Sequence, residues 1–165
     1  MSQVVADHVR SLREHFVATG EAHSYFEINN GLCEDFALDL RKRLEADSID
    51  SMDVENGNFM QGEDDDKDQN DVWDWELLLE HWGIDAPAGF TRDQINAIDF
   101  GNHVWLAVDK RHFDSECPEG VDSFFDLPLF RRYLVTDLRK RGIPAAEVVT
   151  DDVVPAPLCP VANPT

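Results

Sequence analysis

The chain has 165 residues, with 34 acidic and 14 basic side chains and a formal net charge of −20. Its length suits one domain, and a hydrophobic content of 42% indicates a folded protein with a buried core. So negative a surface repels nucleic acid and anionic membranes, and we expect neither as a partner. It is compatible with basic partners, or with an acidic protein that mimics nucleic acid in another protein's binding groove.

The cysteines and the N-terminus bear on the compartment. Cys33, Cys117 and Cys159 form an odd, widely spaced set that does not resemble a disulfide framework, and no Cys-x-x-Cys pair indicates zinc. The N-terminus becomes polar at once, unlike a signal peptide, and no apolar run approaches the roughly 20 residues that span a bilayer. We therefore expect a cytoplasmic protein without cofactor or metal.

Periodicity along the chain predicts a mixture of helices and strands. Apolar residues at helical spacing predict helices over five stretches: 4–17, 33–44, 72–82, 91–98 and 129–138. Alternation over residues 103–108 predicts a half-buried strand, which Asp109-Lys110 would turn into a second strand over residues 111–113. The expected fold class is α+β.

One domain over residues 1–155 accounts for these elements, with no internal repeat. Residues 46–71 are poor in large apolar side chains and rich in Asp, Asn, Ser and Gly, so we interpret them as an acidic surface insertion with room for a short strand near residues 52–54. Residues 156–165 are proline-rich and are expected to form a disordered tail.

The acidic run over residues 63–71 has the alternating carboxylates of a calcium loop, Asp64, Asp66 and Asp68. Gln69 stands where such a loop needs glycine, and Trp75 stands where it needs a bidentate glutamate. We therefore interpret the run as a solvated loop and expect no metal there.

The most informative feature is Cys33, which immediately precedes a predicted helix. A helix N-terminus and a neighbouring imidazolium both stabilise a thiolate, and a carboxylate can hold the imidazole in its working orientation. His103 opens the predicted hairpin and Asp114 follows it. If residues 103–108 pair with residues 109–114, positions 103 and 114 face each other, close enough for an imidazole–carboxylate contact. His112 is the alternative imidazole.

Three short segments, in this order, resemble the transglutaminase-like superfamily. Gly31-Leu32-Cys33-Glu34-Asp35-Phe36-Ala37 is similar to its nucleophile motif G-x-C-x-D-F-A, His103-Val104-Trp105 to its H-x-W strand, and Arg111-His112-Phe113-Asp114 to the strand that ends in the catalytic aspartate. The resemblance implies a papain-like α+β fold, in which N-terminal helices include a nucleophile helix packed on a small antiparallel sheet. The chain departs from the family pattern in two ways. Its span from His103 to Asp114 is shorter, and Asp114 is followed by Ser115-Glu116, where members of the family often have Asp-Pro.

These residues predict a cysteine-dependent acyl-transfer enzyme that acts on a peptide or protein amide through a Cys33-His103-Asp114 triad and a thioester. The Cys33 N–H, Asn29 or Asn30 would stabilise the oxyanion, and Trp105 would form either the core or the wall of the cleft. Hydrolysis, deamidation and crosslinking stay open as reactions. The alternative is an acidic protein-binding module or nucleic-acid mimic on an inactive version of the fold.

Overall fold

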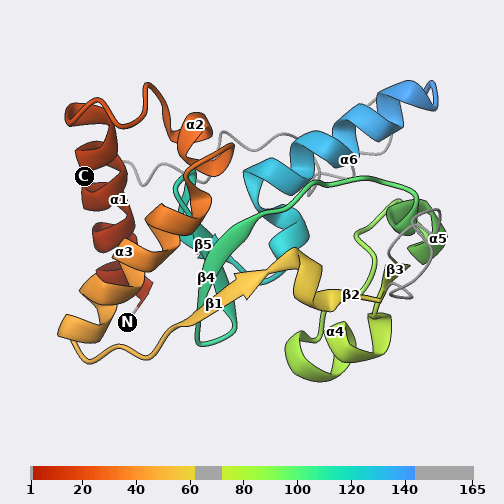
Figure 1. The fold of residues 1–165 in the computed structure, drawn as a ribbon. Helices are drawn as coiled ribbons and strands as arrows, with labels where there is room; N and C mark the ends of the chain where they lie inside the picture. The colour runs from red at the N-terminus through yellow and green to blue at the C-terminus, as the bar shows by residue number, and fades with distance from the viewer. Residues whose placement is uncertain (1, 62–71, 144–165) are drawn as a thin grey trace, which may run out of the picture.

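The computed structural model describes residues 2–61 and 72–143 (Figure 1). Its α-helices are α1 (Ser2–Ala18), α2 (Tyr25–Asn29), α3 (Cys33–Ala46), α4 (Trp75–Trp82), α5 (Arg92–Asn96) and α6 (Pro128–Lys140). Its strands are β1 (Met52–Glu55), β2 (Met60–Gln61), β3 (Val72–Trp73), β4 (Val104–Val108), β5 (Arg111–Asp114) and β6 (Cys117–Val121), and two 3₁₀ turns are η1 (Asn56–Phe59) and η2 (Phe124–Asp126). The predicted α+β class is confirmed.

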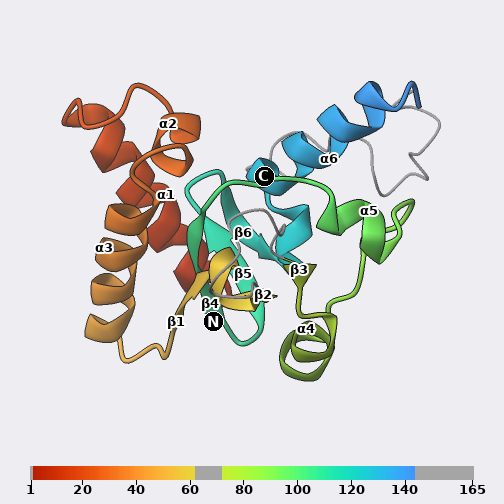
Figure 2. The ribbon, with the colours of Figure 1, turned by 45° about the vertical axis from the view of Figure 1, so that its right-hand side comes forward.

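The main sheet is antiparallel, with the strand order β1-β4-β5-β6. In both views α1, α2 and α3 lie together on one side of this sheet, and α4, α5 and α6 lie on the other (Figures 1 and 2). A separate two-stranded ladder, β2-β3, lies on the side of α4. The sheet is therefore covered on both faces.

Each face of the sheet has its own hydrophobic core. Helices α1 and α3 pack against one face, through Leu106, Val108 and Phe113 of the hairpin. The opposite face contributes Trp105 and Ala107 to a larger, aromatic cluster with α4, α6 and η2. The two faces follow the alternation of side chains along β4, as expected for a strand that is buried on both sides.

Helix α3 is amphipathic and confirms the expectation of a cysteine-bearing helix packed on a small antiparallel sheet. Its buried residues Phe36, Ala37, Leu40 and Leu44 recur at the spacing of one helical face. The N-cap Leu32 provides no side-chain hydrogen bond, so no side chain competes for the free N–H groups of the first turn. The helix consequently starts at Cys33 with donors available to an anion.

The β4–β5 hairpin has the predicted turn but a different register. Asp109 and Lys110 both have positive φ, 50° and 64°, as in the tight two-residue turns that suit antiparallel strands. Val108 pairs with Arg111 and Leu106 with Phe113. This register, continued along the strands, sets Asp114 across from Trp105. The predicted pairing of positions 103 and 114 is therefore wrong by two residues, and Asp114 reaches His103 along a diagonal.

Strand β1 lies within the segment interpreted as a surface insertion. It pairs antiparallel with β4 and buries Val54, so residues 52–55 belong to the main sheet. The acidic run over residues 63–71 and the proline-rich tail over residues 156–165 lie outside the described residues. Among the residues described, no helix combines the length and the apolar character needed to cross a membrane.

Gly120 in β6 occupies a position that other residues cannot fill. Its φ is +69°, and a Cβ there would lie 2.5 Å from the ring of the buried Phe113. We expect Gly120→Ala to lower the free energy of unfolding by about 2–4 kcal/mol, because it combines left-handed strain with overpacking. Urea unfolding measures this change.

Gly142→Ala is the matched control, since Gly142 has a φ of +71° but open space around its Cβ position. Gly142→Ala should lower the free energy of unfolding by about 1–2 kcal/mol, from the left-handed strain alone. Equal losses in the two variants would contradict the close contact between β6 and Phe113.

Candidate active site

Cys33 is a free thiol at the first position of α3 and is partly exposed. Burial opposes its ionisation, but the His103 imidazole and the backbone N–H groups of Val104 and Glu34 favour the thiolate. Together they lower the pKa of the Cys33 thiol below its ordinary value of 9.0. The helix N-terminus and the start of β4 therefore meet at the sulfur, one providing Glu34 and the other Val104.

His103 is fully buried just before β4, with its ring stacked on Trp105 at a centroid distance of 5.7 Å. Its Nε2 lies 3.4 Å from Oδ2 of Asp114. Burial disfavours the imidazolium, but the hydrogen bonds and charges of Asp114 and Cys33 outweigh it and raise the pKa of His103 to about 9. Near neutral pH His103 is therefore held as an imidazolium, which favours ionisation of the Cys33 thiol beside it.

Asp114 is oriented by the turn that follows it. Its Oδ1 accepts hydrogen bonds from the backbone N–H groups of Glu116, at 2.9 Å, and Cys117, at 2.8 Å. These bonds fix the carboxylate, which is 2% exposed, and leave Oδ2 facing the imidazole. The turn that follows Asp114 thus provides local backbone donors to its carboxylate.

Asn56 holds the backbone of His103 in place. Its Oδ1 accepts the His103 N–H at 2.7 Å, and its Nδ2 donates to the Gly101 carbonyl at 2.7 Å. The Asn56 N–H also donates to the His103 carbonyl at 3.3 Å. Asn56 is therefore a positioning residue for the imidazole, and sequence reasoning missed it because it lies in the polar segment interpreted as a surface insertion.

A buried polar network joins the two sides of the site. Asn29 Nδ2 donates to Oε2 of Glu116 at 3.0 Å, and Asn29 Oδ1 accepts the Ser115 hydroxyl at 2.7 Å. The other Glu116 oxygen accepts from Arg132 of α6. This network ties the segment before Cys33 to the turn after Asp114, and therefore helps to fix the position of Cys33 relative to Asp114.

The two candidate oxyanion asparagines differ in what they contact. Asn29 is buried, and both the oxygen and the nitrogen of its side-chain amide form hydrogen bonds in the network with Ser115 and Glu116. Asn30 is exposed, and its amide forms no hydrogen bond among the described residues. The Cys33 N–H likewise has no acceptor within the described part of the chain. Of the expected oxyanion donors, the Asn30 side-chain amide and the Cys33 N–H are thus the ones without a partner among the described residues.

Trp105 and His112 belong to the core. Trp105 is 1% exposed and supports the His103 ring from within the aromatic cluster, so it is not the wall of an open cleft. Its indole N–H donates to Nδ1 of His112 at 2.9 Å. Burial lowers the pKa of His112 to about 4, which keeps that ring neutral. The imidazole that interacts with the Cys33 thiol is therefore that of His103.

Cys117 is disulfide-bonded, contrary to the expectation that the cysteines form no disulfide. Cys33 is the thiol left free among the described residues. The structure over residues 2–61 and 72–143 contains no group of three or more His, Cys, Asp or Glu side chains that could hold a metal ion.

The chain was compared with known protein families, with curated proteins and with solved structures, and none of them matches it. The case for this site consequently depends on its own geometry.

The neutral, buried His112 predicts a loss of stability in mild acid. Its folded-state pKa of about 4 lies below the ordinary value of 6.5, so between these values the unfolded chain binds a proton that the folded chain does not. The contribution of the neutral His112 to the free energy of unfolding is fully present above about pH 6.5 and decreases as the pH drops toward 4. Between these pH values the loss approaches roughly 3 kcal/mol in the free energy of unfolding.

The test is urea unfolding of the wild type and of His112→Gln at pH 7 and pH 5. Gln keeps an acceptor for the Trp105 indole and removes the titrating ring. The difference between the two pH values should be smaller in the variant. An identical pH dependence in both proteins would show that His112 is not held neutral.

Proposed function

We propose that this chain is a cysteine-dependent acyl-transfer enzyme with a papain-like or transglutaminase-like fold, which cleaves or transfers a peptide or carboxamide bond. The observation that carries the proposal is the convergence of Cys33, His103 and Asp114. The pKa of the thiol is lowered and that of the imidazole is raised, as an activated sulfur nucleophile requires.

The reaction follows from the two protonation states. The Cys33 thiolate attacks the amide carbonyl carbon, and the carbonyl oxygen takes the electron pair of the C=O bond. We assign the Cys33 N–H and the Asn30 amide as the donors to this developing charge, and one such donor typically contributes on the order of 10²–10³ in rate. His103 then donates its proton to the leaving amine as the C–N bond breaks, which leaves a thioester on Cys33.

Resolution of the thioester needs a second nucleophile. His103, now neutral, takes a proton from water or from an acceptor amine as that group attacks the thioester carbonyl. Asp114 keeps the imidazole oriented and stabilises its charged form during both steps. Water gives hydrolysis or deamidation, and an amine gives transamidation.

Alkylation of Cys33 by iodoacetamide across pH tests the nucleophile. In the wild type the rate should follow an apparent pKa below the ordinary 9.0 of the thiol, because only the thiolate reacts. His103→Ala should raise that pKa, because the burial of Cys33 would then act without the imidazole that offsets it. Asp114→Asn should give an intermediate shift. Peptide mapping by mass spectrometry measures the rate at Cys33 itself.

His8→Ala is the matched control, because His8 contacts Asp47 on the surface of α1 and α3, away from the triad. It should leave the pH profile unchanged, and circular dichroism checks that each variant is folded. A Cys33 whose pKa is ordinary and does not respond to His103→Ala would favour the alternative, an acidic binding module on an inactive fold.

A further inference from the structure

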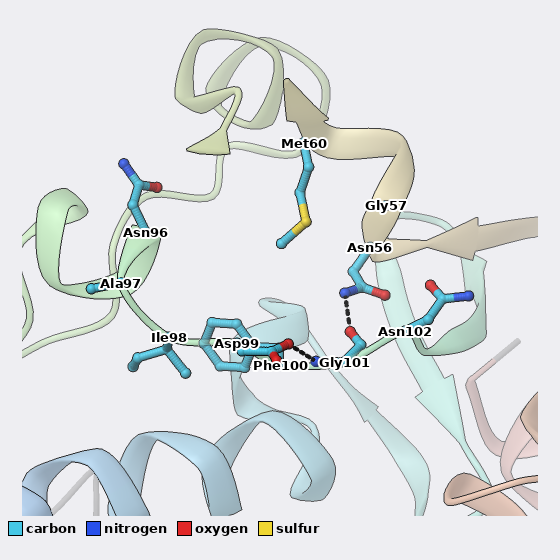
Figure 3. Close-up of a pocket in the computed structure, with 10 residues that line it drawn as sticks. All are labelled: Asn56, Gly57, Met60, Asn96, Ala97, Ile98, Asp99, Phe100, Gly101 and Asn102. Atoms are coloured by element: carbon cyan, nitrogen blue, oxygen red, sulfur yellow. Dashed lines mark hydrogen bonds between the residues drawn. The ribbon is translucent and has the colours of Figure 1, made fainter. Parts of the chain in front are cut away.

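A pocket of about 380 Å³ adjoins the segment that leads into His103 (Figure 3). Residues 56–60 line one side and residues 96–102 the other. Gly101 and Asn102, in its wall, directly precede His103, and Asn56 binds the His103 N–H at 2.7 Å. The pocket therefore adjoins the backbone of His103.

The pocket presents hydrogen-bond acceptors. Asp99 Oδ1 accepts the Gly101 N–H at 2.9 Å, and Asp99 Oδ2 accepts none from the described residues. Asn102 donates through Nδ2 to Glu55 at 2.8 Å, which leaves its Oδ1 on the side of Asn56 and Gly57 (Figure 3). Asp99 is exposed and forms no ion pair within the described part of the chain. Its carboxylate is therefore free to pair with a cation.

The rest of the lining suits an alkyl chain. Met60 points into the space between η1 and the 96–102 segment, and Ile98 and Phe100 add apolar surface (Figure 3). None of the residues that line the pocket is Lys or Arg. An apolar wall with a carboxylate at one side matches a long side chain with a cationic end.

A second pocket, of about 580 Å³, shares Ile98 and Asp99 with the first and is also lined by residues of α2 and α6. Its lining includes Arg132 and Lys140 as well as Asp99 and Asp137, so it has no net charge preference. The first pocket has acidic and neutral groups alone, in a chain with a net charge of −20. Such a field attracts cationic substrates toward the first pocket.

We propose that the first pocket binds a lysine or arginine side chain of the substrate, beside the amide bond that Cys33 attacks. This inference rests on the proposed function and assigns it a substrate class, basic peptides. Met60 and Phe100 contact the alkyl part of the side chain, and Asp99 pairs with its charge. The side-chain oxygen Oδ1 of Asn102 accepts a further hydrogen bond from the cationic group.

The test uses acetyl-dipeptidyl chloromethyl ketones that carry lysine or norleucine at the first or second position. The Cys33 thiolate displaces chloride and forms a thioether, so labelling of the Cys33 peptide reports binding without turnover. In the wild type at least one lysyl reagent should label Cys33 about tenfold faster than its norleucyl partner, which corresponds to about 1.4 kcal/mol. Asp99→Asn should reduce this ratio toward one.

Asp93→Asn is the matched control, since it removes the same charge from the exposed surface of α5 and lies outside the pocket lining. It should keep both the lysine preference and the iodoacetamide rate of the wild type. A reactive Cys33 without lysine preference, or with a preference that survives Asp99→Asn, would overturn this inference alone. A Cys33 that behaves toward iodoacetamide as an ordinary thiol would overturn the proposed function as well.

Discussion

The buried imidazole of His103 is the constraint on which the site depends. Desolvation alone would keep this ring neutral, as it does for His112, whose pKa falls to about 4. His103 instead lies between the Asp114 carboxylate and the Cys33 thiol, and its pKa rises to about 9. Two fully buried histidines in one molecule thus differ in charge, because only His103 has the Asp114 carboxylate and the Cys33 thiol as partners.

The architecture keeps these groups in register. The sheet carries His103 and Asp114 on the face that packs against α6 and η2, while α3 approaches from the other face with Cys33 at its end. Asn56 fixes the backbone of His103, and the Asp114 turn fixes the carboxylate. The Glu116 network then joins the two sides. Each group of the triad is held by bonds that are independent of a substrate.

Sequence patterns predicted the parts that depend on local periodicity. Helix α3 was predicted from four apolar residues on one face, and the hairpin from the alternation of residues before Asp109-Lys110. The predicted register of the β4–β5 hairpin was wrong because Asp109 and Lys110, which form the turn, were counted as paired strand residues. The short strand expected near residues 52–54 is β1, but its place in the main sheet was not predicted, because that place is set by tertiary pairing with β4. Asn56 was missed for the same reason: its role depends on the contact with His103, and polar composition alone indicates a loop.

The charge state of His103 tests the account most directly, and NMR titration of its imidazole nitrogens measures it. The account predicts a pKa near 9 in the wild type and a lower value in Cys33→Ser, because the thiolate stabilises the imidazolium. The ring should also remain charged through neutral pH. A His103 that titrates at or below 6.5, with no response to Cys33→Ser, would contradict the thiolate–imidazolium pair.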